Sequence, residues 1–227
     1  MLRASLIAAC MVIGCGREHG APHVQRMPPL DKVPALRGGG TARSPRIANY
    51  KLDAKLDPAT HQVIGTETLT WTNTGASQVD TLPFHLYPNA FKNEKSMFMR
   101  ESRGEMRGAH ASDSGWGWIN VDSLQIGGVE LARELKFPHG DAGDETVAEL
   151  KLAQAVQPGQ TIEINFKFTE QLPEVFARSG YKGEFNLVGQ WFPKIGVRMG
   201  PPGAEHWECQ PYEAFTEFFA DFGVYDV

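Results

Sequence analysis

Residues 160–169, QTIEINFKFT, decide the fold class of this chain. From Ile162 to Phe168, isoleucine and phenylalanine alternate with glutamate, asparagine and lysine. Because successive side chains of a strand point to opposite faces, this period of two predicts a β-strand with one buried face. Pro158-Gly159 precedes the segment and Pro173 follows it, and both are typical of strand ends.

Further segments alternate in the same way and are separated by turn residues: 50–56, 63–73, 81–87, 119–126 and 146–152. The first two predict a β-hairpin that turns near residues 58–61, with Leu69 and Trp71 on the buried face of its second strand. Residues 90–118 do not alternate, which predicts a long loop with at most a short helix. Short strands with turns between them favour an all-β fold, an antiparallel β-sandwich.

The composition excludes several classes of protein. With 41% hydrophobic and 22% charged residues, the 227-residue chain is neither disordered throughout nor collagen-like. Its net charge of −5 gives no overall basic footprint, so we expect no nucleic-acid partner. No stretch reaches the ~18 apolar residues of a membrane-spanning helix.

Residues 1–14 have the features of a bacterial signal peptide, in which a short positive region precedes an apolar segment. Residues 12–15, VIGC, resemble the lipobox of bacterial lipoproteins. That resemblance implies cleavage before Cys15 and its acylation, and several acyl chains on one residue anchor a protein stably. Gly16, in place of an aspartate, favours the outer membrane. We therefore expect a lipid-anchored protein of the bacterial cell envelope that faces the periplasm or the exterior; an ordinary signal peptide cut elsewhere is the alternative.

Residues 15–46 predict a disordered, Gly/Pro-rich tether. Five glycines and five prolines fall in this stretch, without a sustained helical or strand period. The tether is basic and the body, 47–227, is acidic, which suits a position beside anionic headgroups, although a solvated spacer with incidental charge is an equal alternative. His19 and His23 have the spacing of a helical metal site, but the glycine and proline between them discourage a helix, so we expect no metal there.

Five segments of the body together carry a resemblance to a known family: 50–57 (YKLDAKLD), 63–73 (VIGTETLTWTN), 82–90 (LPFHLYPNA), 189–197 (GQWFPKIGV) and 217–227 (EFFADFGVYDV). In order and at compatible spacing, the first three look like the opening of the M1 family of zinc metallopeptidases, and the last two resemble a bacterial, M1-like branch. The similarity covers about 48–227 and departs from the family pattern between 198 and 216. It implies the family's N-terminal β domain, a saddle-like antiparallel sandwich that packs on a catalytic domain.

The catalytic elements of that family do not occur in this sequence. The family holds zinc through a helical His-Glu-x-x-His and a later glutamate, and binds substrate through a Gly-x-Met-Glu-Asn-like strand. The histidines of the body are scattered, and none has a histidine four residues later: His61, His85, His110, His139 and His206. We therefore expect a C-terminally truncated, non-catalytic domain without catalytic, cofactor-binding or metal residues. Zinc is expected only in the missing catalytic peptidase domain, the partner of this chain if the full gene encodes it.

Two small groups of residues could carry other chemistry. His206, Glu208 and Cys209 offer three types of metal ligand, but strand alternation sends Cys209 to the opposite side from the other two. A buried, apolar environment is the simplest expectation for that unpaired thiol. Glu184 and Glu217 could form the carboxylate pair of a glycoside hydrolase, although isolated surface glutamates are commoner.

Tryptophans could also build a sugar-stacking platform. Trp191 and Trp207 are expected in the core or at a domain interface, so 115–118, GWGW, is the better candidate for an exposed aromatic loop. A stand-alone lipoprotein β-sandwich that binds peptide or carbohydrate therefore remains the alternative function. Residues 185–227 hold ten aromatic side chains, so we expect exposed apolar surface there and self-association of the body.

Overall fold

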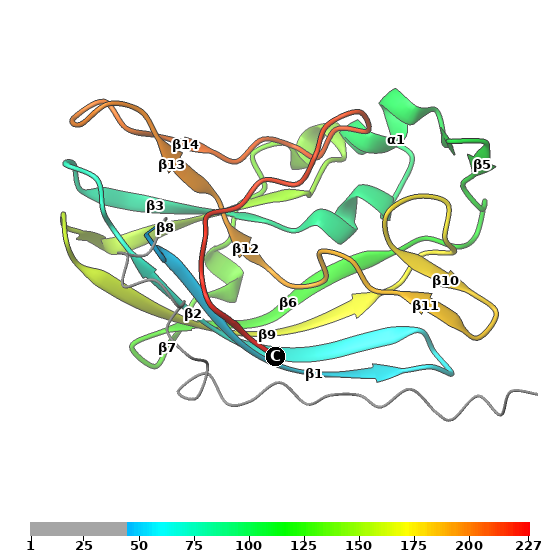
Figure 1. Ribbon diagram of the computed structural model, residues 1–227, viewed down its shortest axis with the longest axis horizontal. Helices are drawn as coiled ribbons and strands as arrows, with labels where there is room; N and C mark the ends of the chain where they lie inside the picture. The colour runs from blue at the N-terminus through cyan, green and yellow to red at the C-terminus, as the bar shows by residue number, and fades with distance from the viewer. Residues whose placement is uncertain (1–44) are drawn as a thin grey trace, which may run out of the picture. The chain divides into compact units, whose positions relative to one another are not determined.

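The computed structural model describes residues 45–227, and these residues confirm the predicted all-β class, with several mainly antiparallel sheets and one short α-helix (Figure 1). The predicted signal peptide, Cys15, the His19/His23 pair and nearly all of the predicted tether lie outside the described residues. Within the described part, no helix has the length and apolar character needed to cross a bilayer.

A six-stranded sheet forms one layer. Its strands, in spatial order, are β15 (Tyr225–Asp226), β1 (Ala48–Asp57), β2 (Gln62–Thr72), β9 (Thr161–Gln171), β6 (Trp118–Ile126) and β7 (Val129–Glu130). All neighbours are antiparallel except β15, which runs parallel to β1. The predicted hairpin is confirmed as β1 and β2, whose turn ends at His61 with a left-handed φ of 55°.

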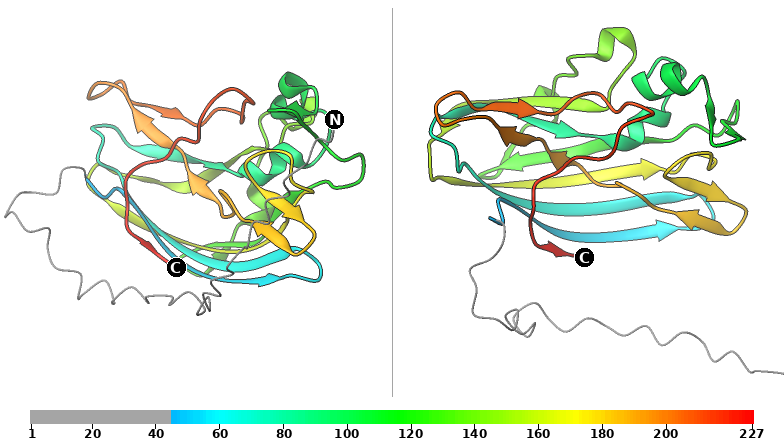
Figure 2. Two further views of the ribbon diagram at one scale, coloured as in Figure 1. Left: turned by 45° about the vertical axis from the view of Figure 1, so that its right-hand side comes forward. Right: turned by 45° about the horizontal axis from the view of Figure 1, so that its top comes forward.

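A three-stranded sheet forms the second layer (Figure 2). It consists of β12 (Lys194–Ile195), β3 (Val79–His85) and β8 (Val147–Val156). The main hydrophobic core lies between the two layers, where the ring of Phe84 on β3 meets that of Phe166 on β9 edge-on at 5.3 Å. Aromatic pairs of this geometry add to the stability that buried apolar area provides.

The remaining elements are short and lie around the two layers. They are η2 (Tyr87–Phe91), α1 (Met97–Ser102), β4 (Glu105–Met106), β5 (Ala109–His110), η3 (Ala132–Glu134), η4 (Gly140–Ala142), β10 (Gly180–Lys182), β11 (Phe185–Leu187), β13 (Val197–Met199) and β14 (His206–Glu208). The predicted loop over 90–118 with a short helical piece is confirmed. Helix α1 begins where the Ser96 side chain accepts a hydrogen bond from the Met99 amide. Residues of this helix belong to a second hydrophobic cluster, called the second cluster below: Tyr87, Ala90, Phe91, Phe98, Met99, Phe176, Ala177, Tyr212 and Ala214.

The alternation predicted for β9 is confirmed, since Ile164, Phe166 and Phe168 are buried between exposed polar neighbours. On β3 the expectation of a single buried face is wrong, because Pro83 and His85 are buried as well as Leu82, Phe84 and their neighbours. Chain from far along the sequence covers the outer face of this sheet. Cys209 lies beside Gly196 and Pro83, and the Tyr212 amide donates to the hydroxyl of Thr146 at 3.0 Å.

Candidate functional site

His206, Glu208 and Cys209, which offer three types of metal ligand, do not come together. His206 Nε2 and Glu208 Oε1 lie 2.9 Å apart on the same side of β14, as strand alternation predicts. Cys209 points elsewhere, and burial raises the pKa of its thiol above the ordinary value. In residues 45–227, no three His, Cys, Asp or Glu side chains are grouped so that they could hold a metal ion.

The two glutamates considered as a hydrolase pair have separate environments. Glu217 accepts two hydrogen bonds from the guanidinium of Arg178, at 2.7 and 2.8 Å, and these bonds lower the pKa of its carboxyl. Glu184 is exposed in the turn between β10 and β11. The partner that the structure gives Glu217 is therefore an arginine, which sequence spacing could not indicate.

The candidate aromatic loop at 115–118 does not form an exposed platform, because Trp116 and Trp118 are both half-buried and Trp116 packs against the second cluster. The two glycines of this segment bring its backbone close to residues 173–174. A Cβ at Gly117 would lie 2.6 Å from the Pro173 nitrogen, and the Gly115 carbonyl accepts from the Glu174 amide at 2.9 Å. The expectation for Trp207 is met, since it is partly buried with its ring 5.4 Å from that of Trp71.

Several ionisable side chains are buried in the described body, and four of them lie in or beside the two layers: Glu67, His85, Glu170 and Lys194. Neither carboxylate oxygen of either glutamate has a hydrogen-bond partner among the described residues. Lys194 donates to Gln190 Oε1 at 2.5 Å and lies 4.8 Å from the centre of the Phe192 ring.

Burial controls the protonation of these groups. Removal from water raises the pKa of Glu67 and of Glu170 well above the ordinary value, and the positive charge of Lys194 opposes this rise at Glu67. Burial lowers the pKa of Lys194 to about 8 and that of His85 to about 4. The alternation of the two strands could have revealed both glutamates. Glu67 lies on the same inward-facing side of β2 as Leu69, and Glu170 lies on the same inward-facing side of β9 as Phe168.

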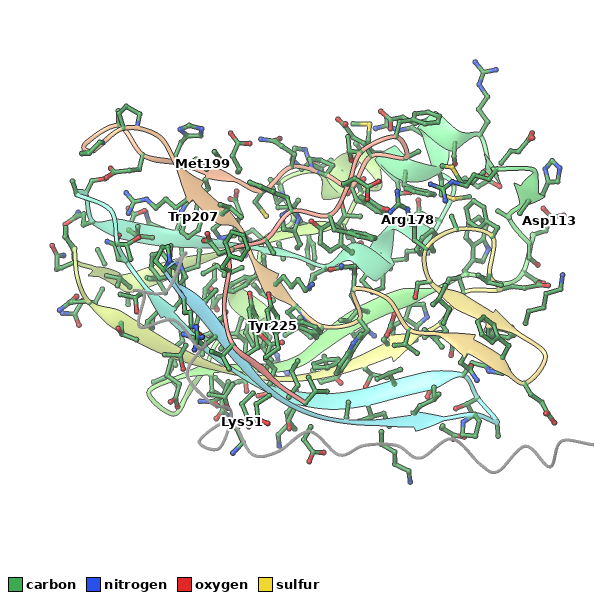
Figure 3. All side chains as sticks on the ribbon, viewed as in Figure 1. Lys51, Asp113, Arg178, Met199, Trp207 and Tyr225 are labelled. Atoms are coloured by element: carbon green, nitrogen blue, oxygen red, sulfur yellow. The ribbon has the colours of Figure 1, made fainter. Side chains whose placement is uncertain are left out.

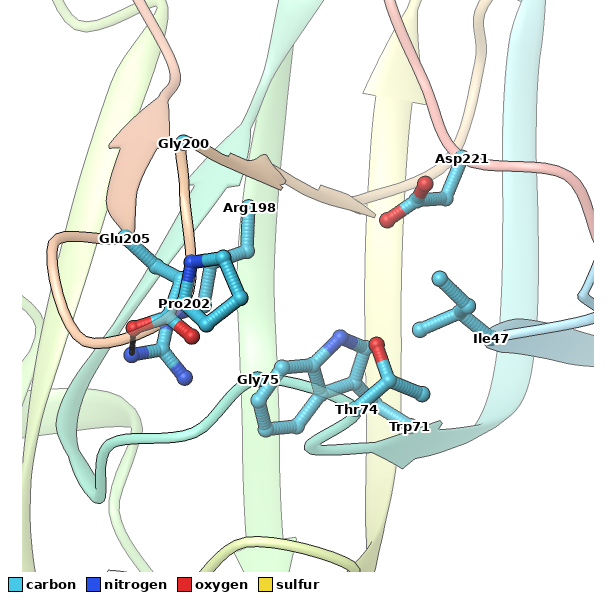
Figure 4. A pocket seen from close by; sticks show the side chains of 9 residues that line it. All are labelled: Ile47, Trp71, Thr74, Gly75, Arg198, Gly200, Pro202, Glu205 and Asp221. Atoms are coloured by element: carbon cyan, nitrogen blue, oxygen red, sulfur yellow. Dashed lines mark ion pairs between the residues drawn. The ribbon is translucent and has the colours of Figure 1, made fainter.

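A polar pocket of about 190 Å³ opens at the end of the sandwich where β2 leads into residues 74–75 (Figure 4). Trp71 lines it, and the buried indole N–H of that residue has no hydrogen-bond partner among the described residues. Asp221 points its carboxylate into the pocket from the other side, and partial burial raises the pKa of that carboxyl (Figure 4). The pocket therefore combines a free donor with an acidic acceptor.

An ion pair fixes the wall of this pocket. Arg198 donates to Asn73 Oδ1 at 2.7 Å and to the Ser77 hydroxyl at 2.6 Å, and its Nη2 lies 3.6 Å from Glu205 Oε2. The Ala76 amide and the Ser77 hydroxyl donate to Glu205 and hold the pKa of its carboxyl down at about 2. Because these two charges neutralise each other, Asp221 gives the pocket its net negative character.

The segment after β14 carries an exposed set of aromatic side chains, called the aromatic strip below: Phe215, Phe219 and Phe222, which are 79%, 45% and 70% exposed. This segment runs from β14 to the edge of the six-stranded sheet, where Tyr225 on β15 stacks on Tyr50 with ring centres 5.0 Å apart (Figure 3). Large exposed apolar side chains along one segment make that segment a candidate interaction surface.

Comparison with known proteins gives no family for this chain. No protein-family model matches the sequence, and no curated protein matches it either.

Proposed function

We propose that residues 47–227 form the non-catalytic N-terminal domain of an envelope-anchored, M1-like zinc aminopeptidase. In this proposal the domain positions or caps the active site of a catalytic peptidase domain, and acylated Cys15 attaches the whole protein to the membrane. The sequence resemblance over 48–227 and the two-layer β fold support it. Catalysis and zinc belong to the partner domain.

The aromatic strip carries this proposal. Phe215 and Phe222 each expose more than two thirds of their side chain. Each phenylalanine that leaves water contributes about 1.5–3 kcal/mol, so the strip favours association with another surface. Its place beside the last described strand suits a partner that follows this domain in the same protein.

The gene sequence after codon 227 tests the proposal first. We expect an open frame that encodes a His-Glu-x-x-His helix within a few hundred residues, and a clean stop with no such frame would overturn it. The encoded catalytic domain, expressed separately, should bind the wild-type chain. Phe215→Ser with Phe222→Ser should abolish that binding, whereas Phe185→Ser, at a side chain 61% exposed outside the strip, should leave it intact.

A stand-alone lipoprotein module that binds peptide is the second candidate, and the polar pocket favours it. An ammonium group at Asp221 and a carbonyl at the Trp71 N–H would together match the amino-terminal end of a peptide. Trialanine should then shift the indole N–H resonance of Trp71, whereas N-acetyl-trialanine should not. Asp221→Asn should remove the response, and an unmoved Trp71 resonance in the wild-type chain would rule this candidate out.

A further inference from the structure

A second pocket, called the acidic pocket below, lies where the segment after β14 meets the end of β3 and has a volume of about 240 Å³. His85 and Tyr87 come from the β3 side, and residues 208–219 supply the rest of the lining, including Tyr212 and Glu213. None of the lining residues belongs to β15 or follows it. At ~30 Å³ per water molecule, the pocket has room for several waters or for one small organic molecule.

Two buried polar side chains line the acidic pocket without a hydrogen-bond partner. Both ring nitrogens of His85 and the hydroxyl of Tyr212 lack a partner among the described residues, and these residues are only 4% and 2% exposed. His85 stacks on Tyr87 with ring centres 4.6 Å apart, and Tyr212 stacks on both Phe98 and Phe218, at 5.0 and 4.9 Å, so both rings are fixed in place. Because an unpaired buried polar group is destabilising, the pocket favours an occupant that supplies the missing hydrogen bonds.

Both of these side chains are neutral near pH 7. Burial and the nearby charge of Lys194 lower the pKa of His85 to about 4, and burial raises the pKa of Tyr212 to about 12. A neutral imidazole has one nitrogen that donates and one that accepts, and a tyrosine hydroxyl does both. A hydroxyl group of a ligand also donates and accepts, so it can pair with any of these atoms.

The charged groups of the acidic pocket are all carboxylates. Among the described residues, three glutamates line it, Glu208, Glu213 and Glu217, and no lysine or arginine does. Glu217 is bound by Arg178, and Glu208 lies 2.9 Å from His206. Glu213 is half-buried, and its carboxylate forms no ion pair within the described part of the chain. A positively charged group in the pocket would therefore gain an ion pair with Glu213.

We propose that the acidic pocket binds an amino sugar, whose ammonium group pairs with Glu213 and whose hydroxyls pair with His85 and Tyr212. The ammonium group supplies the positive charge that the lining lacks, and the hydroxyls supply the partners that the two buried side chains lack. A bare metal ion does not suit the pocket, because no three possible ligands are grouped in the described residues. Stacking already fixes the two buried rings, so they lose little conformational entropy on binding. The inference does not depend on the proposed function.

Titration of the full chain with glucosamine tests the site. The chain carries isotope-labelled histidine, is purified in mild detergent, and is observed by NMR in slightly acidic buffer, in which the amine of the sugar is protonated. The ring nitrogen resonances of His85, assigned through the His85→Phe variant, should shift saturably, because a new hydrogen bond changes the shielding of a nitrogen. Glucose has the hydroxyls without the charge and should bind about tenfold more weakly.

Two variants separate the role of the charge from that of the hydroxyl. Glu213→Gln should weaken glucosamine binding about tenfold and leave glucose binding unchanged. Tyr212→Phe should weaken the binding of both sugars, because it removes the hydroxyl and keeps the ring. Two matched controls lie outside the pocket and should change neither affinity: Glu184→Gln, at an exposed carboxylate, and Tyr181→Phe, whose ring stacks on that of His61.

The stability of the protein without ligand gives an independent readout. If the Tyr212 hydroxyl has no partner in the free protein, Tyr212→Phe should not lower the free energy of unfolding in urea. A Tyr212→Phe variant that is less stable and binds glucosamine as the wild type does would show that ordered water pairs the hydroxyl, and would overturn the proposal. An absent or non-saturable His85 shift, equal affinities for glucose and glucosamine, or wild-type affinity in Glu213→Gln would each overturn it as well.

Discussion

Glu170→Gln is expected to flatten the dependence of stability on pH near neutrality. The Glu170 side chain on β9 is 0% exposed, and its oxygens have no hydrogen-bond partner among the described residues. Burial raises the pKa of its carboxyl well above 4.5, so the folded protein holds a proton there that the unfolded chain releases. Each pH unit above the unfolded pKa then lowers the free energy of unfolding by about 1.4 kcal/mol, for as long as the folded carboxyl stays protonated.

The pKa shifts of the other buried groups define the pH window for this measurement. A carboxyl with a raised pKa contributes stability below its unfolded pKa and loses it as the pH rises. His85, whose pKa falls from 6.5 to about 4, contributes stability above pH 6.5 and loses it toward pH 4. Lys194, whose pKa falls from 10.5 to about 8, changes its contribution only between those values. Between pH 6.5 and 8 the buried glutamates therefore dominate the slope.

Urea unfolding at several pH values in this window measures the effect. The wild-type chain should lose stability through Glu170 as the pH rises across this window, at most about 2 kcal/mol if the folded carboxyl stays protonated over all 1.5 pH units at 1.4 kcal/mol each, and Glu170→Gln should lose correspondingly less. Glu163→Gln, at an exposed carboxyl of the same strand, should keep the wild-type slope. Equal slopes for the wild type and Glu170→Gln would show that Glu170 is ionised in the folded protein and refute the reasoning.

Three further outcomes are expected. Cys15→Ser should move the protein from the membrane fraction to the soluble fraction; unchanged fractionation would contradict the lipobox interpretation. Metal analysis of the purified chain should find no stoichiometric zinc, and aminoacyl reporter substrates should stay uncleaved, whereas one bound zinc with chelator-sensitive hydrolysis would contradict the proposed non-catalytic role. Gly65→Ala should lower the free energy of unfolding in urea by about 2 kcal/mol, because its Cβ would lie 2.3 Å from the Phe168 ring, and a neutral result would mean that the ring moves freely.

The long strands could be predicted from the sequence because each spans several periods of alternation. Strands β1, β2 and β9 have ten or eleven residues, so a period of two is unmistakable in them. After residue 173 the strands have only two or three residues, too few to show any period. Their positions are set by contacts with distant chain, such as the pairing of Lys194 with His85.

The surroundings of single side chains were harder to predict than the strands. Glu217 is bound by Arg178, and His85 is covered by chain that lies more than a hundred residues later, so local sequence carries no signal of either contact. Glu67 and Glu170 are different, because a charged residue at an inward strand position is itself a signal. Because successive side chains of a strand point to opposite faces, marking the inward-facing positions for polar as well as apolar residues would have found both.

The aromatic strip is a surface whose backbone is held in place while its side chains face water. The Phe219 amide donates to the Tyr87 hydroxyl at 3.1 Å, and the Phe222 carbonyl accepts from the Ile47 amide at 3.1 Å. Phe218, next to Phe219 in the chain, turns inward and packs against Tyr87 with ring centres 4.9 Å apart. A flexible segment would lose conformational entropy on binding, about 1–2 kcal/mol for each residue ordered, but a segment already fixed on both sides loses little. Most of the free energy gained by burying these rings therefore remains for affinity, which favours a docking surface over an incidental exposure of apolar residues.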